Sequence, residues 1–561
     1  MKCGVRGGNK KMKVDRIKIV NFKCFKGEFN LKLNNGLNVL VGENESGKST
    51  ILEAIHLALT GLFNGRYLKN ELTQYLFNNE VVNKYLNDLS QGKAANLPYI
   101  LIEIFISGED LPLFEGDGNS EKVKACGISL KIAFDDKYKA EYEELIKNEN
   151  VVKTIPIEYY DILWTSFARE NITARSIPVK SAMIDSSSNR YQNGSDIYIS
   201  RIVRDNLEPK EIVEISQAHR TMRDSFMECE AIKNINTKIN TKIKSDAKIS
   251  NKKIELSVEL LSKNAWENSL MTYLDEVPFH FVGKGEQCII KTKLALGHKK
   301  SKEANLILLE EPENHLTHSR LNQLTNDIKE EHQDKQIIIS THSSFVANKL
   351  GLDNLILLND SKTICFNDLR AETNSFFAKI SGYDTLRLIL CKKAILVEGD
   401  SDELVLQKAY MLENKGKLPI EDEIDVISVG NSFLRFLEIA EKIYKPVVVV
   451  TDNDGDIEAV RKKYENYLGN KAKFHIKIRF DNTVDSGDLI LGTKPFNYNT
   501  LEPKMVKVNS LQNFNKILET DFNCLDDLHK YMKQNKTECA LKVFDTKEEL
   551  KFPDYIIEAI K

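Results

Sequence analysis

Carboxylates gather where an apolar run ends, in residues 394–406, which read AILVEGDSDELVL. The apolar stretch gives way there to Glu398, Asp400, Asp402 and Glu403. Carboxylates this close repel one another unless protons or cations neutralise them. Hard oxygen ligands of this kind suit Mg²⁺ or Mn²⁺. The pattern therefore predicts a site for divalent cations.

A second acidic cluster ends another apolar run, at residues 446–456, PVVVVTDNDGD, where Asp452 and Asp454 flank an asparagine. Between the two clusters the pattern predicts a helix, a strand and a second helix, over residues 402–412, 425–431 and 433–443. This βαβαβ alternation makes the strands parallel, with their carboxyl ends on one edge. Open α/β sheets place their sites at that edge, so we expect the two clusters to converge there.

Other acidic motifs fit the second cluster less well. An EF-hand loop counted from Asp452 needs Gly at its sixth position and Glu at its twelfth, where this chain has Ile457 and Lys463. A haloacid-dehalogenase-type phosphatase needs Thr or Val where Asp456 stands. The EF-hand is excluded, while the phosphatase and plain solvated loop ends stay open as alternatives.

A phosphate-binding loop stands near the start of the chain, in residues 37–59, LNVLVGENESGKSTILEAIHLAL. From Gly42 to Ser49 it has the full G-x-x-x-x-G-K-[ST] pattern between a strand and a helix. Its glycines let backbone N–H groups wrap phosphate oxygens, and the helix N-terminus adds partial positive charge. Lys48 would reach the β- and γ-phosphates and Ser49 would ligate Mg²⁺, so the loop predicts ATP.

Three later stretches indicate which kind of ATPase this is. They are a glycine turn that opens a helix, a strand that ends in two glutamates, and a strand that ends before a histidine, in residues 281–296, 304–316 and 336–345. Glu311 could orient the attacking water, and His342 could sense the γ-phosphate. Their order after the phosphate-binding loop resembles the heads of ABC-type ATPases of the recombination-and-repair kind, such as SMC and RecF proteins.

This resemblance implies the nucleotide-binding residues and a homo-oligomer, because two such heads sandwich ATP between them. The implied residues are Gly42, Asn44, Gly47, Lys48, Ser49, Thr50, Gly285, Gln287, Glu310, Glu311 and His342, with Ser49 and Glu310 as Mg²⁺ ligands. Two positions depart from the usual pattern: Glu310 replaces an Asp, and Gly283 replaces a Ser. We therefore expect ATP binding, with ATP as a conformational ligand and slow hydrolysis.

The acidic segment resembles a Toprim domain, whose signature is one strand ending in Glu-Gly and a second ending in D-x-D. An ABC-type head followed by a Toprim domain resembles the OLD (overcoming lysogenisation defect) family of ATP-linked endonucleases. The stretches that carry this resemblance are VEGDSDE, VVVVTDNDGD, NTLEP at 499–503 and NKTECALKVF at 535–544. A topoisomerase would also need a tyrosine nucleophile in a separate domain, and a bacterial primase a zinc ribbon; neither is marked out.

The resemblance implies DNA cleavage by a two-metal mechanism and names the residues that would carry it. The implied catalytic residues are Glu398, Asp402, Asp452, Asp454, Glu502 and Lys536, of which the five acids would hold two Mg²⁺ or Mn²⁺ ions. Lys536 would offset charge on the transition-state phosphate. Its alternative is a surface lysine, with Lys533 and Lys542 as nearby substitutes.

Length and composition limit the class of protein. At 561 residues the chain is too long for one core, and 42 % apolar with 29 % charged residues is typical of a globular protein. It lacks both a long apolar run and a signal-type N-terminus, which argues against a membrane protein or secretion. The nine cysteines form no CxxC pair, which favours a reducing cytoplasm. A net charge of −3 gives no argument for nucleic acid.

The expected fold class is α/β, an ABC-type SMC/RecF-like head with a helical insertion, followed by an α/β Toprim domain with a parallel sheet. The expected segments are a disordered leader, the first part of the head, the insertion, the second part of the head and the Toprim domain, over residues 1–11, 12–204, 205–275, 276–385 and 386–561. The insertion could dimerise or form a lid on its own head. Its lysine-rich stretch, 231–253, reads as a solvated helix face or a DNA-facing surface.

The sequence thus predicts an ATP-binding, metal-dependent endonuclease that cleaves or nicks DNA in anti-phage defence. The alternative is a repair-type ABC ATPase or scaffold that binds DNA and has an inert or partner-dependent Toprim site. RNA as substrate stays open, because phosphate contacts carry no base information. Relatives of this kind sometimes act beside a helicase or a retron-type reverse transcriptase, but no partner can be read from this chain.

Overall fold

The computed structural model describes residues 12–561 except 64–65, 94, 148–151, 186–190, 193–194, 197–206, 247–255, 257–271, 298–304, 315, 332–334, 360–361 and 381–384. The predicted leader, 1–11, lies outside the described residues. The chain forms two compact units: the first unit consists mainly of residues up to Thr341, and the second unit mainly of residues from His342 onward. The domain limits drawn from the sequence stay a prediction.

An antiparallel sheet in the first unit is built from the strands β2, β1, β6 and β8 in that order, with β9 beside β8. Their bounds are Glu28–Lys32, Lys13–Val20, Ile100–Ser107, Ala125–Phe134 and Tyr160–Ser166. In β6 the first seven residues are all buried, which explains its nearly continuous apolar sequence.

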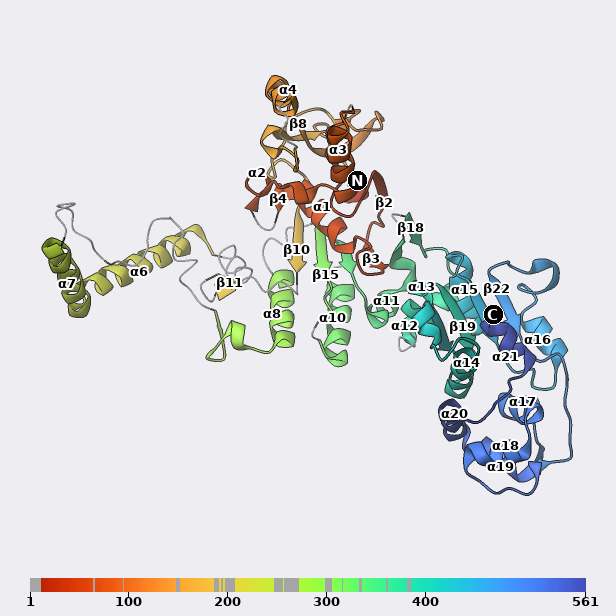
Figure 1. Ribbon diagram of the computed structural model, residues 1–561. Helices are drawn as coiled ribbons and strands as arrows, with labels where there is room; N and C mark the ends of the chain where they lie inside the picture. The colour runs from red at the N-terminus through yellow and green to blue at the C-terminus, as the bar shows by residue number, and fades with distance from the viewer. Residues whose placement is uncertain are drawn as a thin grey trace, which may run out of the picture. The chain divides into compact units, whose positions relative to one another are not determined.

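A parallel sheet carries the phosphate-binding loop of the first unit. The strands β10, β15, β16 and β3 pair in that order, over Ser181–Asp185, Leu306–Glu310, Gln336–Ser340 and Leu37–Gly42. The helix α1, Lys48–Thr60, packs on β10, β15 and β16 (Figure 1). Short apolar strands buried on both faces are typical of parallel sheets covered by helices.

Further helices of the first unit include α3, α6, α7, α8 and α10. Their bounds are Asn79–Ser90, Pro209–Glu228, Glu230–Asp246, Lys284–Gly297 and His318–Glu331. The helices α6 and α7 belong to the predicted insertion, 205–275, of which most residues after 246 lie outside the described residues. Whether the insertion dimerises stays a prediction.

Four parallel strands form the sheet of the second unit, in the order β20-β19-β21-β22. They span Ile424–Ser428, Lys393–Val397, Val447–Val450 and Ile476–Arg479. The helices α14, α15 and α16 connect or follow them, over Asp400–Glu413, Phe433–Lys442 and Ile457–Lys463. The predicted βαβαβ alternation is confirmed, with β22 as a further strand and α14 beginning two residues earlier than expected.

Helices at the end of the chain complete the core of the second unit. They are α17, α18, α19, α20 and α21, over Leu501–Val508, Leu511–Leu518, Leu525–Gln534, Lys536–Asp545 and Asp554–Ile560. Their apolar side chains share one core with β19, β21 and α14, and α20 packs directly on α14 (Figure 1). This packing brings α17 and α20 to the sheet that carries the acidic clusters.

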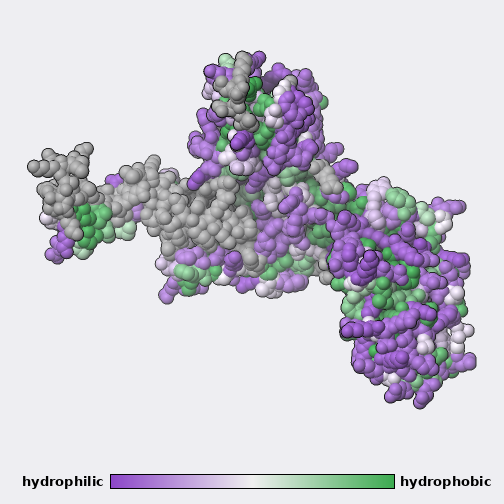
Figure 2. Space-filling model, in the orientation of Figure 1, coloured by the Kyte–Doolittle hydropathy of each residue, from purple (hydrophilic) through white to green (hydrophobic). Residues whose placement is uncertain are grey.

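Within the described part of the chain, no helix combines the length and the apolar sequence that crossing a bilayer requires. In the view of Figure 2, the coloured surface is largely hydrophilic.

One buried amide links the two sheets of the first unit. β2 pairs with β1 from Arg16 to Val20, and the backbone N–H and C=O of Val14 are instead bonded to the Gln336 side chain, at 2.8 and 2.7 Å. Gln336 is 1 % exposed and also donates to the carbonyl of Asn34. The start of β16 is thereby attached to β1.

We expect Gln336→Leu to lower the free energy of unfolding by about 2–3 kcal/mol, because it leaves buried backbone groups unpaired. Urea unfolding would measure the change. The matched control is Gln323→Leu on the exposed side of α10, which should change stability by less than about 0.5 kcal/mol. Equal effects of the two substitutions would contradict the role given to Gln336.

Candidate nucleotide and metal-binding sites

The phosphate-binding loop runs from the end of β3 to the start of α1. Gly47 directly precedes the helix with φ 96°, and a Cβ added there would lie 2.5 Å from the ring of Phe25. Only glycine satisfies both the positive φ and this close approach. In the first turn of α1, Thr50 accepts a bond from the Cys24 thiol at 3.5 Å, and Asn44 in the loop is exposed.

Lys48, the first residue of α1, is 5 % exposed. Burial lowers the pKa of its ammonium, and the charges of Glu311 and Glu313 oppose that effect. Its Nζ lies 3.4 Å from Oγ of Ser46. The lysine that would hold phosphates therefore stands in the field of the acids that follow β15.

The acids after β15 are positioned by the neighbouring strand β16. Glu310 ends β15, and Glu311 follows with φ 40°, its N–H donating to the carbonyl of Ser340 at 3.0 Å. The Thr341 hydroxyl donates to Glu313 at 2.6 Å. Glu313 was not among the residues predicted from the sequence, although it stands in the same acidic run, EEPE.

The glycine turn predicted in 281–296 opens α8. Gly283 precedes the helix with open space around it, and Gly285 lies in the first turn. Gln287 is buried, and its Nε2 donates to the carbonyl of Val282 at 2.7 Å, which fixes the turn. His342 lies exposed, two residues after β16 ends.

The second unit places its acidic residues at the carboxyl edge of the parallel sheet. Glu398 follows β19 directly, and Asp402 lies in the first turn of α14 and accepts a bond from the Gly399 N–H at 3.0 Å. Asp452 follows β21, and Glu502 lies in the first turn of α17, 8 % exposed.

These carboxylates are close enough to change one another's protonation. Burial raises the pKa of Asp452 to about 8, and the charges of Asp402, Glu398, Glu502 and Asp454 add to the effect. Burial also raises the pKa of Asp402 to about 7, with smaller contributions from Glu502 and Glu398, while the Gly399 N–H acts in the opposite direction. Burial likewise raises the pKa of Glu398.

Lys536 brings a positive charge to the same edge. It is the first residue of α20, and its Nζ lies 3.1 Å from Oε1 of Glu502. Burial alone would lower the pKa of its ammonium, but Glu502, Asp452 and Asp402 outweigh burial and raise it. The two lysines given as substitutes for Lys536 contact other groups: Lys533 stands over the ring of Phe496, and Lys542 donates to the carbonyl of Leu518.

Asp454 differs from the other acids in being exposed, with φ 51°. It accepts a bond from Asn497 Nδ2 at 2.8 Å. Among the described residues, no three His, Cys, Asp or Glu side chains are drawn together tightly enough to hold a metal ion as they stand. The carboxylates share one edge of the sheet but are separately engaged, for example with Gly399, Lys536 and Asn497.

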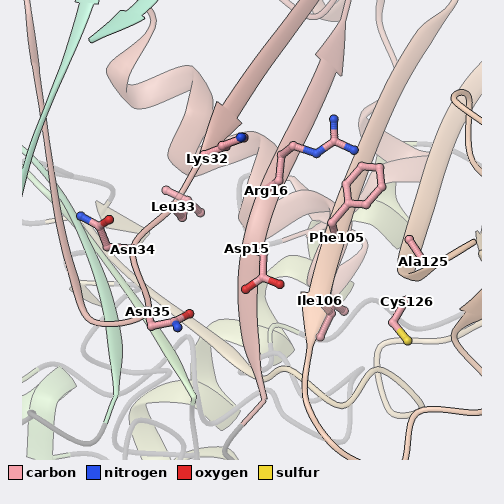
Figure 3. Close-up of a pocket in the computed structure, with 10 residues that line it drawn as sticks. All are labelled: Asp15, Arg16, Lys32, Leu33, Asn34, Asn35, Phe105, Ile106, Ala125 and Cys126. Carbon is pink, nitrogen blue, oxygen red and sulfur yellow. The ribbon is translucent and has the colours of Figure 1, made fainter. Parts of the chain in front are cut away.

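A surface groove of about 660 Å³ lies on the antiparallel sheet of the first unit (Figure 3). The guanidinium of Arg16 stands 3.8 Å from the centre of the Phe105 ring and forms two bonds to Glu121. Lys32, Asn34 and other neighbours line the rest of the groove. None of the residues predicted to bind nucleotide or metal contributes to its lining.

Comparisons with known proteins find short or distant likenesses. The DNA replication and repair protein RecF of Clostridium tetani is 32 % identical over 75 residues, which are 13 % of this chain and 20 % of that protein. The match thus spans about a fifth of that relative's length.

Two solved structures are similar at low identity. The structure of the recombination mediator protein RecF with ATP is 12 % identical, covering 65 % of this chain and 100 % of that one, with a TM-score of 0.33. The Smc head domain with an extended coiled coil, bound to the C-terminal domain of ScpA from Pyrococcus furiosus, is 12 % identical, covering 66 % and 99 %, with a TM-score of 0.31.

Family models match both parts of the chain. The model of an AAA ATPase domain matches residues 12–347, which is more than half of the chain. The model of the Toprim domain of proteins like the overcoming lysogenization defect protein matches residues 389–454, where the two acidic clusters lie. The expected α/β fold class, an ATPase head followed by a Toprim domain with a parallel sheet, is confirmed. The chain belongs to the OLD (overcoming lysogenisation defect) family, in which an ATPase domain is joined to a Toprim domain.

Proposed function

We propose that this protein is an ATP-binding, metal-dependent endonuclease that cleaves or nicks DNA. The observation that carries the proposal is the gathering of the acids Glu398, Asp402, Asp452 and Glu502, with Lys536 bonded to the last of them. An arrangement of buried carboxylates with one cation is suited to phosphodiester chemistry, in which negative charge must be held and then stabilised.

The residues at this edge fit divalent cations. Every donor is a carboxylate oxygen, the kind that Mg²⁺ and Mn²⁺ prefer. Because the pKa of Asp452 is raised to about 8 and that of Asp402 to about 7, their joint ionisation at neutral pH requires added positive charge. We infer that Glu398, Asp402, Asp452, Asp454 and Glu502 hold two cations. Two bound cations would supply an activated water and stabilise the leaving oxygen.

The chain's own residues orient the site and hold the substrate. The Gly399 N–H fixes the Asp402 carboxylate against the start of α14. Lys536 presents its ammonium beside Glu502, where it can bind a phosphate oxygen of the scissile bond. Lys536 is about half-exposed, so a phosphate can reach it from solvent.

The ATPase domain implies ATP as a second ligand. We propose that Lys48 and Ser49 bind its phosphates and Mg²⁺, with Glu310, Glu311 and His342 on the γ-phosphate side. The Glu at position 310 and the Gly at 283 favour a conformational role over fast hydrolysis. Family membership supports a homo-oligomer and a role in anti-phage defence, both as proposals.

A second candidate function is a repair-type ATPase that binds DNA without cleaving it. The match of 75 residues to a DNA replication and repair protein favours it. The two candidates differ in whether the acidic edge is needed for the reaction, which substitution of one acid tests directly.

Cleavage of plasmid DNA tests whether the acidic edge carries out the reaction. Supercoiled plasmid incubated with the protein and Mg²⁺ or Mn²⁺, with and without ATP, should be nicked, and Asp452→Asn should lower the rate by about 10²-fold or more, because a metal ligand is lost. Asp400→Asn is the matched control: Asp400 is an exposed acid in the first acidic cluster and should leave the rate within about twofold.

Persistent nicking in Asp452→Asn would contradict the proposed site. Absence of nicking in the wild type, with ATP binding intact, would favour the second candidate. Matched RNA run beside the plasmid would show whether the substrate is restricted to DNA.

Lys536→Met tests the electrostatic role of the lysine. We expect kcat to fall by about 10²-fold, because the phosphate loses its positively charged partner. Lys533→Met, three residues earlier, should have little effect, since that side chain lies over Phe496. Single-turnover nicking rates would measure both, and equal losses in the two variants would contradict the assignment.

The raised carboxyl pKa values also predict how the metal-free protein responds to pH. Folded Asp452, with a pKa of about 8 against an ordinary 3.8, keeps a proton that the unfolded chain releases above about pH 4. The stabilisation from this proton is present at low pH and is lost as pH rises from about 4 to about 8.

In EDTA, the unfolding midpoint of Asp452→Asn should therefore rise relative to the wild type between about pH 5 and pH 8.5, by the equivalent of roughly 4 kcal/mol, since about 1.4 kcal/mol is lost for each pH unit up to the folded pKa. Asp400→Asn should show no such trend. A constant difference between Asp452→Asn and wild type across this range would show that Asp452 does not titrate there.

A further inference from the structure

A lysine that the proposed chemistry does not use is buried beside the carboxylate edge. Lys504 lies on α17, two residues after Glu502, and is 2 % exposed. Its Nζ lies 2.9 Å from a carboxylate oxygen of Asp481 and 2.6 Å from one of Asp485, and it donates to the carbonyl of Thr483 at 2.9 Å. One buried ammonium thus fixes a whole loop, residues 481–485, to the helix that carries Glu502.

The same loop is bonded from its other side by the asparagine of the D-x-D segment. Asn453 is 1 % exposed, and its Nδ2 donates to the carbonyls of Asp481 and Thr483 at 2.6 and 2.9 Å. Its Oδ1 accepts from the N–H of Gly455 at 3.0 Å. The residue between Asp452 and Asp454 is therefore attached to the backbone of loop 481–485.

A second connection runs through two asparagines that precede α17. Asn499 is buried and exchanges two bonds with the backbone of Asp485, at 2.7 and 2.8 Å. The N–H of Asn499 donates to Asn497, whose Nδ2 donates to Asp454 at 2.8 Å. The D-x-D segment is thus joined to α17 through loop 481–485, and to the residues before α17 directly through Asn497.

This loop follows β22, so it lies at the same carboxyl edge as the acidic clusters. Each of its connections ends on a segment that carries an acid of the site, either the D-x-D segment or α17. Removing one partner of a buried ion pair is strongly destabilising, because the charge of the other partner is left buried without a counter-charge. Loop 481–485 is therefore expected to move if Lys504 loses its charge.

We propose that Lys504 is a positioning residue that, through loop 481–485, sets the distance between the D-x-D segment and Glu502. In this role Lys504 contacts no reacting group itself. It acts by holding loop 481–485, and through that loop the D-x-D segment with Asp452 and Asp454, in place. The inference rests on the proposed metal-binding function, of which it names a supporting residue. Mutation of residues that bond to metal ligands and orient them commonly weakens metal affinity by 10–100-fold.

Lys507, on the same helix, bonds the same loop but is exposed to solvent. It also pairs with Asp485, at 2.7 Å, but its side chain is 49 % exposed. Surface ion pairs contribute little, so Lys507 is not expected to hold the loop. The two lysines lie on one helix, share one aspartate and differ chiefly in burial.

The experiment measures Mn²⁺ binding to the full chain by titration calorimetry, independently of cleavage. Lys504→Met should weaken Mn²⁺ binding by about 10–100-fold, and Lys507→Met by less than about twofold. Asn453→Ala breaks the same connection from the D-x-D side and should weaken binding to a similar degree. Combining it with Lys504→Met should add little beyond either change alone, because both act through one loop.

Circular dichroism and the unfolding midpoint of each variant separate positioning from loss of fold. Should Lys504→Met fail to fold, Asn453→Ala carries the test. A folded Lys504→Met or Asn453→Ala variant with wild-type Mn²⁺ affinity would overturn the inference.

Failure of the inference and failure of the proposed function give different results. Weakened Mn²⁺ binding in the variants, together with a wild type that nicks no plasmid, would support the positioning role and reject the nuclease. Nicking by the wild type, together with unchanged Mn²⁺ binding in the variants, would support the nuclease and overturn the positioning role of Lys504. A wild type that binds no Mn²⁺ would overturn both.

Discussion

Burial of several carboxylates at one sheet edge is the constraint on which the acidic site of the second unit depends. The parallel strands β19 and β21 end at one edge and bring Glu398 and Asp452 close enough for each negative charge to disfavour the other. The raised pKa values of Asp452 and Asp402 follow from this arrangement, since burial chiefly, and neighbouring negative charges as well, disfavour ionisation. The structure around this edge supplies the compensation: the Gly399 N–H at the start of α14, an ammonium from α20, and the side-chain amide of Asn497.

The compensation explains why the acids share an edge without forming a closed cage. Asp402 is engaged by the Gly399 N–H, Glu502 by Lys536, and Asp454 by Asn497. Each of these bonds directs a carboxylate toward its own partner. The edge is therefore assembled by the fold, with each of these carboxylates held by its own partner.

In the first unit the buried charged group is positive rather than negative. There burial lowers the pKa of the Lys48 ammonium, and the charges of Glu311 and Glu313 after β15 oppose that effect. The close approach of Gly47 to Phe25 fixes the loop that ends in this lysine. Each unit thus buries charged side chains beside one another, a lysine among acids in the first unit and carboxylates beside a lysine in the second.

Local pattern determined the phosphate-binding loop, the strands β3, β15, β19 and β21, and the two acidic clusters, because periodicity and glycine spacing act over a few residues. Glu502 and Lys536 came from family resemblance, since nothing in their own segments marks them. Only the packing of the last helices on α14 decided that Lys536, rather than Lys533 or Lys542, meets Glu502. The roles of Lys504 and Asn453 likewise depend on a loop after β22, whose place is fixed by long-range contacts that no local pattern records.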